Sequence, residues 1–336
     1  MLYEPMGSMS DGLAGKRLMQ DEQRRKEAKA RVEQSALSCD DASLTSVTWR
    51  VCAVIVTYHP TAKMLENIPN VLAQVQGLVV VDNGSNAVEI EPLRVASQGL
   101  GFHLIENGEN LGIAEALNQG VLWAKSKGYP WIVLFDQDSE ITDGFIAGMF
   151  AAWQTHPEPE RVCSIHPSYV QPVTGIEPFV RRARDGGPVT SMTSGALMPA
   201  WIFDKIGLFA SEYFIDLVDC EYSLRIRAAG YLLADSREAV LLHTAGNPKR
   251  ISFLGFSFQP SYHSPMRRYY ISRNRVVVYL KYFKKFPRWT LHSMYESFQE
   301  TIKCLVAEQN RPRKFRNFLL GTWDGLTGRM GKREGL

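Results

Sequence analysis

Four short apolar runs alternate with longer amphipathic stretches between residues 51 and 136. The runs are VCAVIVT at 51–57, LVVV at 78–81, FHLIE at 102–106 and WIVLF at 131–135, and each gives way to polar or glycine-rich sequence. Continuous apolar runs of this length are typical of strands buried on both faces, and strands that alternate with helical segments indicate βαβ units. The sequence therefore predicts an α/β domain with a mainly parallel sheet flanked by helices.

The strand-like run at 131–135 is followed directly by Asp136-Gln137-Asp138. Open α/β sheets bind their ligands in the crevice beyond the carboxyl ends of the strands. Two aspartates at this spacing can place oxygen ligands beside a hard divalent cation that holds a diphosphate. An isolated pair of this kind is more often a solvated acidic turn, so the neighbouring motifs decide between the two interpretations.

Two further motifs follow the second and third predicted strands. The turn Asp82-Asn83-Gly84-Ser85 could present a carboxylate to a ring N–H of a pyrimidine, although an ordinary Asn-Gly turn also explains it. Asn110 and Gly112 precede a stretch with helical apolar spacing from 113 to 127, and exposed N–H groups at a helix start favour anionic ligands. Plain helix capping by Asn110 is the alternative.

A second acidic cluster lies in the apolar segment 214–225 and contains Asp216, Asp219 and Glu221. If the segment is helical, Asp216 and Asp219 share one face and Glu221 is turned away. A carboxylate in a crevice can deprotonate an attacking hydroxyl group. The alternative is a helix start, where the macrodipole favours acidic residues. Further on, His243 follows a strand-like run and could bind a metal ion held by Asp138, although a single histidine there is more often structural.

Composition and absent motifs exclude several classes of protein. The chain of 336 residues has a net charge of +3, which is too small to indicate a nucleic-acid partner. Its five cysteines have no paired spacing, which indicates reduced thiols in a cytoplasmic protein, and no apolar window reaches the length of a membrane span. HExxH, CxxC, GxGxxG and GxxxxGK[ST] motifs are absent, which argues against zinc, dinucleotide and P-loop sites.

We expect three regions along the chain. Residues 1–48 are polar and highly charged and are predicted to be a disordered extension, residues 49–265 form the α/β domain, and residues 266–336 form a basic and aromatic helical region. The segments 279–290 and 310–333 would suit a peripheral contact with a membrane surface. Helices packed on the domain, or a homo-oligomer interface, explain the same composition.

Taken in order, these motifs resemble the family 2 glycosyltransferases with a GT-A fold, and within them the bacterial rhamnosyltransferases that build surface polysaccharides. The resemblance covers residues 50–280. It is carried by VIVTYHP (54–60), VVVDNGS (79–85), NLGIAEALNQG (110–120), FDQDS (135–139), SGALM (194–198), KIGLFASEYFIDLVDCEYSLR (205–225), GY (230–231) and RRYYISRN (267–274).

The resemblance implies a role for each site residue. The nucleotide-sugar site would comprise Thr57, Tyr58, Asp82, Asn83, Asn110, Gly112 and Asp136, and Asp138 with His243 would bind Mg²⁺ or Mn²⁺. Asp219 would be the catalytic base of an inverting transfer. Many relatives have Glu before this aspartate where this chain has Val218, which makes Asp216 or Glu221 an alternative base. Arg267, Arg268 and Arg273 would meet phosphates of the donor or of the acceptor.

The expected activity is metal-dependent transfer of a sugar, L-rhamnose from dTDP-rhamnose, to a saccharide or polyprenyl-linked acceptor in cell-envelope polysaccharide (lipopolysaccharide) synthesis. The enzyme would be cytoplasmic, with a peripheral position on the inner face of the plasma membrane as one option. The alternatives are a different donor, such as a UDP-hexose, or an inactive nucleotide-sugar- or glycan-binding protein. A nucleotidyltransferase is disfavoured because the loop at 58–61 is not basic and only Lys63 lies nearby.

Overall fold

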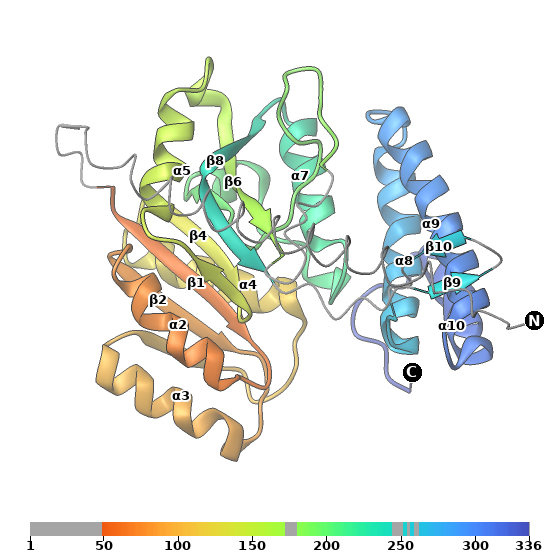
Figure 1. Ribbon diagram of the computed structural model, residues 1–336, viewed down its shortest axis with the longest axis horizontal. Helices are drawn as coiled ribbons and strands as arrows, with labels where there is room; N and C mark the ends of the chain where they lie inside the picture. The colour runs from red at the N-terminus through yellow and green to blue at the C-terminus, as the bar shows by residue number, and fades with distance from the viewer. Residues whose placement is uncertain (1–48, 172–179, 244–250, 254–255, 259–261, 336) are drawn as a thin grey trace, which may run out of the picture.

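A computed structural model describes residues 49–171, 180–243, 251–253, 256–258 and 262–335 (Figure 1). The predicted extension at 1–48 lies outside the described residues. The strands are β1 Val51–Thr57, β2 Gly77–Asp82, β3 His103–Glu106, β4 Trp131–Asp136, β5 Ser139–Ile141, β6 Val162–Val170, β7 Leu197–Pro199, β8 Leu232–His243, β9 Ile251–Phe253 and β10 Phe256–Phe258.

The helices alternate with the strands up to β4, and the last three helices follow one another after β10. They are α2 Ala62–Leu72, α3 Ala87–Leu100, α4 Ile113–Ser126, α5 Phe145–Gln154, α6 Ile202–Ile206, α7 Val218–Ala228, α8 Pro265–Tyr282, α9 Pro287–Ala307 and α10 Arg311–Leu326, with 3₁₀ turns η2 Pro159–Arg161 and η3 Ser211–Tyr213. No helix in the described part of the chain is both long and apolar enough to cross a bilayer.

The central sheet has two halves of different character. Its order is β3-β2-β1-β4-β7-β6-β8-β5, and the first four strands are all parallel. In the second half β7 runs antiparallel to both β4 and β6, β6 and β8 are parallel, and β5 closes the edge antiparallel to β8. The prediction of a mainly parallel sheet flanked by helices is confirmed, and the antiparallel strands belong to the part that carried no clear strand pattern.

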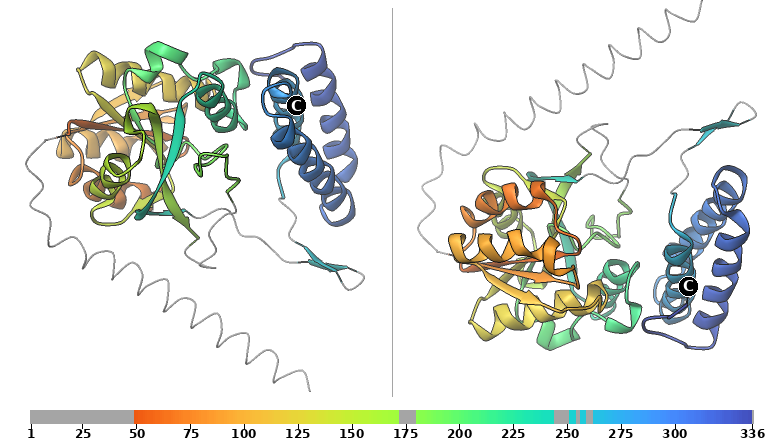
Figure 2. Two further views of the ribbon diagram at one scale, coloured as in Figure 1. Left: turned by 90° about the horizontal axis from the view of Figure 1, so that it is seen from above. Right: turned by 90° about the horizontal axis from the view of Figure 1, so that it is seen from below.

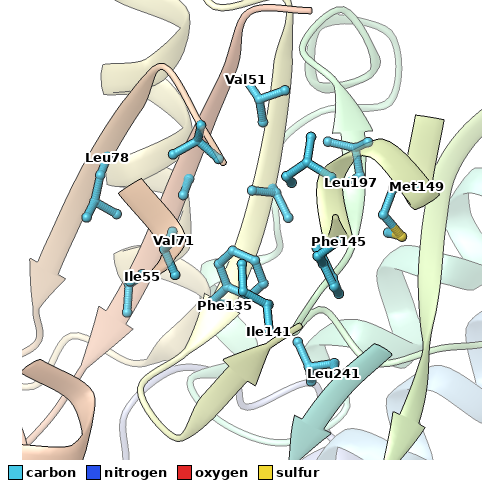
Figure 3. Close-up of a cluster of buried hydrophobic side chains, with 14 of the residues drawn as sticks. Val51, Ile55, Val71, Leu78, Phe135, Ile141, Phe145, Met149, Leu197 and Leu241 are labelled. Carbon is cyan, nitrogen blue, oxygen red and sulfur yellow. The ribbon is translucent and has the colours of Figure 1, made fainter. Parts of the chain in front are cut away.

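Alternation along the strands divides the core into two layers. Val51, Ala53 and Ile55 of β1 face a cluster completed by α2, α3 and α5, part of which is shown in Figure 3. Cys52 and Val54 face the opposite cluster, which α4, α6 and α7 cover. Both sets are buried because helices cover both faces of the sheet, which explains why the sequence of β1 is apolar throughout.

The last three helices form a layer beside α7 (Figures 1 and 2). Helix α10 lies against α8 so closely that a Cβ atom on Gly321 would come within 2.2 Å of the Tyr269 carbonyl oxygen. Buried charges in this layer are paired: Glu308 accepts hydrogen bonds from Arg268 at 3.1 Å and from Lys314 at 2.6 Å. The prediction of a helical C-terminal region is confirmed, and apolar side chains of α9 and α10 also remain exposed.

Candidate active site

The carboxyl ends of the parallel strands meet at one edge of the sheet. Thr57, the last residue of β1, is in register with Asp82, the last residue of β2, and Val56 is in register with Asp136 of β4. The sheet register therefore brings together three residues that the sequence places in different motifs. This edge is the candidate donor side of the site.

Gln137 connects two of these strand ends. Its Oε1 atom accepts hydrogen bonds from the Thr57 hydroxyl group at 2.6 Å and from the Tyr58 backbone N–H at 2.9 Å. Thr57 is buried as a result, whereas the Tyr58 side chain is 44% exposed at the mouth of the site. Sequence reasoning missed Gln137, although it stands between the two aspartates that were singled out.

The Asp82 carboxylate shapes the turn that follows β2. It accepts hydrogen bonds from the backbone N–H groups of Gly84 at 3.1 Å and Ser85 at 2.9 Å, and from the Ser85 hydroxyl group. Gly84 has a φ of 97°, and a Cβ atom there would lie 2.3 Å from the Glu109 backbone. The buried Asp82 is therefore a turn-forming residue, in addition to any contact that it makes with a nucleotide.

An asparagine network joins this turn to the start of α4. The Asn83 amide group donates to Asn110 Oδ1 at 3.2 Å, and its oxygen accepts from Asn107 and from the Leu111 N–H at 3.0 Å. Asn110 in turn accepts from the Gly112 N–H, and Gly112 itself is the N-cap of α4, without a side-chain cap. The alternative interpretation, in which Asn110 caps this helix, is therefore wrong, because the Asn110 side chain binds the N–H of Gly112, the N-cap residue itself. Asn107 was not predicted.

The segment before α7 has an unusual backbone. Phe214, Asp216 and Leu217 all have φ between 61° and 65°, in the left-handed region that residues with a Cβ atom rarely adopt. Helix α7 begins only at Val218, so the predicted placement of Asp216 and Asp219 on one helical face is wrong. The Phe214 carbonyl group accepts a hydrogen bond from the Ile113 N–H at 2.7 Å, which joins this segment to the start of α4.

Helix α8 holds this segment in place. The Asn274 amide group donates to the carbonyl oxygens of Tyr213 at 3.0 Å, Ile215 at 2.8 Å and Asp216 at 2.9 Å. Arg273 donates to the carbonyl oxygens of Glu212 and Tyr213, and both α8 residues are fully buried. These bonds, which span about sixty residues of sequence, stabilise a backbone that is strained locally.

The three arginines predicted to meet phosphates lie in different surroundings. Arg268 and Arg273 are buried among protein oxygen atoms, so neither is accessible to a phosphate in this structure. Arg267 is 43% exposed and pairs with the Asp216 carboxylate at 2.6 Å. Both carboxylate oxygen atoms of Asp216 therefore already accept hydrogen bonds from Arg267.

Asp219 lies in the first turn of α7 and lines a cavity of about 310 Å³. Burial and the nearby carboxylates of Asp216 and Asp136 raise its pKa to about 6, although its Oδ1 accepts a hydrogen bond from the Cys220 N–H at 2.7 Å. The electrostatic effect of Asp136 on Asp219 indicates that the strand-end site and this cavity are close together. A carboxylate with this pKa is ionised at neutral pH and is still basic enough to accept a proton.

Glu221 occupies a different environment two residues later. It is 1% exposed and pairs with Arg225 at 2.5 Å and with Lys281 at 2.8 Å, and it accepts a hydrogen bond from the Tyr282 hydroxyl group. Burial acts to raise its pKa, but Arg225 and Lys281 outweigh burial and hold the pKa below its usual value. Glu221 therefore ties α7 to α8, which is a poor arrangement for the alternative base.

The predicted metal ligands lie at the same sheet edge. Asp138 is exposed, and His243 ends β8 directly opposite Ser139 in the register, with its side chain outside what the structure describes. No group of three His, Cys, Asp or Glu side chains with metal-binding geometry occurs among the described residues. The Asp138 carboxylate still fits Mg²⁺ or Mn²⁺, because hard cations at phosphate sites are held by one or two carboxylates together with the substrate and water.

The chain is similar in sequence to known glycosyltransferases. Residues 52–172 match the model of the Glycosyl transferase family 2. The chain is similar to the dTDP-rhamnosyl transferase RfbF of Shigella flexneri, with 28% identity over 297 residues, which are 84% of this chain and 97% of that protein. It is also similar to the galactofuranosyltransferase GlfT1 of Mycobacterium tuberculosis, with 26% identity over 249 residues, 68% of this chain and 82% of that protein.

Two solved structures share the fold. The structure of GalNAc-T7 with UDP, GalNAc and Mn²⁺ superposes with a TM-score of 0.56 at 15% identity over 85% of this chain, which spans 58% of the GalNAc-T7 chain. The mannosyltransferase PcManGT of Pyrobaculum calidifontis, in complex with GDP-Man and Mn²⁺, gives a TM-score of 0.53 at 14% identity, covering 91% of this chain and 96% of that one. At these identities the likeness concerns the fold, which is the GT-A fold expected from the sequence.

Proposed function

We propose that this chain is an inverting family 2 glycosyltransferase that transfers L-rhamnose from dTDP-rhamnose to a hydroxyl group of a saccharide acceptor. The observation that carries the mechanism is Asp219, whose carboxylate lines a cavity and lies close enough to Asp136, at the end of β4, to be affected by its charge. The donor is proposed from the likeness to RfbF, whose length the match covers almost completely.

The proposed reaction is a single displacement. An oxygen atom of the acceptor attacks the anomeric carbon as the bond from that carbon to the diphosphate oxygen breaks. The attacking hydroxyl group gives its proton to Asp219, and the nucleoside diphosphate leaves with the electron pair of the broken bond. The exposed Tyr58 ring and the Asp82–Ser85 turn would hold the nucleotide, and Asp136 would face its ribose or the sugar. The helix start at Gly112 would lie near the nucleotide, where N–H groups favour anions.

We propose Mg²⁺ or Mn²⁺ as the cofactor, held by Asp138 together with His243. Both superposed structures carry Mn²⁺ with a nucleotide or nucleotide sugar. When bound, the cation would neutralise negative charge that grows on the departing diphosphate. Asp138→Ala should therefore abolish the metal-dependent part of donor binding, which titration calorimetry with dTDP in Mg²⁺ and in EDTA would measure. Equal dTDP affinity of wild-type protein under both conditions would contradict the metal role.

The donor can be identified by thermal shift with a panel of nucleotide sugars in the presence of Mg²⁺. A rise in Tm with dTDP-rhamnose that exceeds the rise with UDP-hexoses supports the proposal. A larger rise with a UDP-hexose would keep the mechanism and replace the sugar. Binding of a donor without release of its nucleoside diphosphate, with any acceptor or with water, would favour an inactive nucleotide-sugar-binding protein.

We also propose that residues 49–265 form the catalytic domain and that residues 266–336 complete its acceptor side and touch the membrane surface of a lipid-linked acceptor. Phe283, Lys284 and Lys285 are exposed between α8 and α9, and α9 exposes Leu291 and Tyr295, a combination that suits an anionic headgroup layer. Flotation with phosphatidylglycerol vesicles tests this contact. Flotation that is equal with uncharged phosphatidylcholine vesicles, or absent with both, would contradict it.

A further inference from the structure

The cavity beside Asp219 has three sides, which come from separate parts of the chain. Tyr169 of β6 and residues 190–192 form one side, and Asp219 and Cys220 of α7 form another. The third side comes from Trp289, Ser293 and Glu296 of α9, which lie about seventy residues after Asp219. Helix α9 is therefore part of this cavity, and the helical layer does more than support the loop before α7.

Hydrogen bonds connect the wall of the cavity to the end of β4. The Tyr169 hydroxyl group in the cavity wall donates to the Ser194 carbonyl oxygen at 3.0 Å, and the Ser194 hydroxyl group accepts from the Asp136 N–H at 3.2 Å. Ser194 therefore connects the wall of the cavity to the residue that ends β4. A hydroxyl group bound in the cavity would lie beside Asp219 and near the strand ends at which the donor is proposed to bind.

One face of α9 lines the cavity. Trp289, Ser293 and Glu296 are spaced four and three residues apart, so they share one helical face, whereas the opposite face exposes Leu291, Tyr295, Phe298 and other apolar residues. Contacts fix the inner face: the Ser293 hydroxyl group bonds the Tyr279 hydroxyl group at 3.0 Å, and the Trp289 ring packs edge-on against Tyr279.

The charged side chains in the cavity wall determine which class of ligand the cavity can bind. Among the described residues that line it, the charged ones are Asp219, Glu296 and Arg181. The Arg181 guanidinium group lies 3.1 Å from Glu296 Oε1, so its positive charge is already balanced. A phosphate-bearing ligand would meet the uncompensated charge of Asp219, whereas the hydroxyl groups of a neutral sugar can both donate to the carboxylates and accept from the guanidinium group. The indole of Trp289 adds an apolar surface, as is usual in small-molecule sites.

We propose that this cavity is the acceptor subsite, that α9 supplies its specificity through Trp289, Ser293 and Glu296, and that it takes an uncharged sugar ring. The inference rests on the proposed glycosyl transfer and extends it to the class of acceptor. The charged or lipid part of a longer acceptor would lie outside the cavity. Trp289 and Glu296 are specificity residues here, and Asp219 remains the group that accepts the proton.

A bulky substitution tests the cavity. Ser293→Trp should fill it and raise the acceptor KM at least about tenfold, because a displaced sugar loses its hydrogen bonds to charged groups. The donor KM and the slow hydrolysis of dTDP-rhamnose by water should stay at wild-type values. The assay measures dTDP release with methyl glycosides of neutral hexoses and with the corresponding hexose 1-phosphates. Met294→Trp places the same indole ring on the exposed face of the helix and should leave every parameter unchanged.

Glu296→Gln tests the charge without filling the cavity. Its side chain is 55% exposed, so the fold should tolerate the change. The variant should raise the acceptor KM for neutral glycosides several-fold and improve the use of hexose 1-phosphates, because Arg181 then lacks its counter-ion. A wild-type preference for hexose 1-phosphates over neutral glycosides would overturn the proposed ligand class, and an unchanged acceptor KM in Ser293→Trp would overturn the cavity assignment.

The two proposals can fail separately. If wild-type protein releases no nucleoside diphosphate from any donor, with or without acceptor, the proposed function fails. Saturation-transfer NMR with the methyl glycosides then tests the cavity directly, and Ser293→Trp but not Met294→Trp should abolish the signal. Equal signals from wild-type protein and Ser293→Trp would overturn the inference.

Discussion

The strand ends of β1, β2 and β4 and the segment before α7 both bring polar side chains to the same site, but they are held in place over different distances in the sequence. Asp82 is fixed by Gly84 and Ser85 of its own turn. The segment at 212–216 is fixed by Arg273 and Asn274 of α8, about sixty residues later. The donor side is thus built by local turns on a sheet, whereas the base side depends on a helical layer added after the sheet is complete.

This difference predicts which substitutions affect which function. A substitution in a strand-end turn should weaken donor binding and leave the rest of the site in place. A substitution in α8 that removes its hydrogen bonds to the segment that leads into α7 should displace this segment, and with it Asp219, while donor binding stays unchanged. Substitutions on the two sides should therefore separate donor binding from turnover.

The largest effect is expected for Asp219→Asn. Removal of a general base lowers kcat by about 100- to 10,000-fold, and the dTDP affinity should be unchanged because the nucleotide lies at the strand ends. Steady-state rates and calorimetry measure both quantities. A variant with near wild-type kcat would show that another group accepts the proton.

The same variant should be more stable than wild-type protein above pH 6. The raised pKa of Asp219 means that its ionisation opposes folding. This cost is absent below the unfolded-state pKa near 4, grows as the pH rises from 4 to 6, and is fully present above the folded-state pKa of about 6. Asparagine removes a cost of up to about 3 kcal/mol at pH 8. Urea denaturation at pH 8 and pH 4 measures it, and equal stabilisation at both values would contradict the assignment.

A smaller loss of turnover is expected for Asn274→Ala. Three carbonyl groups of the segment before α7 lose their common donor, at a cost of about 2–4 kcal/mol in stability. The kcat should fall with little change in dTDP affinity, because the donor side does not depend on α8. Asn317→Ala is a matched control, since this buried amide group donates to Pro265 in the same helical layer, away from the segment. An equal loss of kcat in both variants would show that the effect is general destabilisation.

The smallest effect is expected on the donor side for Gln137→Ala. The variant loses the bonds to Thr57 and Tyr58, each worth about 1 kcal/mol, so the Tyr58 loop should loosen and the donor KM should rise several-fold. The kcat at saturating donor should stay within about twofold of wild type, because Asp219 keeps its position. A fall in kcat without a change in donor KM would contradict the separation of the two sides.

The sequence predicted that the polar residues after β1, β2 and β4 lie together, because parallel strands in register align their ends. Once the runs at 51–57, 78–81 and 131–135 are recognised as strands, Thr57, Asp82 and Asp136 must come close together. The antiparallel strand β7 was not predicted, because three residues are too few to show a period.

The base side could not be predicted in the same way. Residues 214–217 contain no glycine, yet three of them adopt positive φ because Asn274 and the Ile113 N–H provide compensating hydrogen bonds from other elements. Arg268 and Arg273 were expected at phosphates, but their partners, such as Glu308 and the Tyr213 carbonyl oxygen, lie far away in sequence. Pairing over such distances leaves no local pattern.

The pH dependence of kcat/KM for the acceptor tests the central claim, that Asp219 is the proton acceptor of the site. With the pKa of Asp219 raised to about 6 and the ionised form active, kcat/KM should be constant above pH 7 and fall about tenfold per pH unit below 6. The residual activity of Asp219→Asn should lack this acidic limb. A wild-type profile without a limb near pH 6, or a variant that keeps the same limb, would contradict the account.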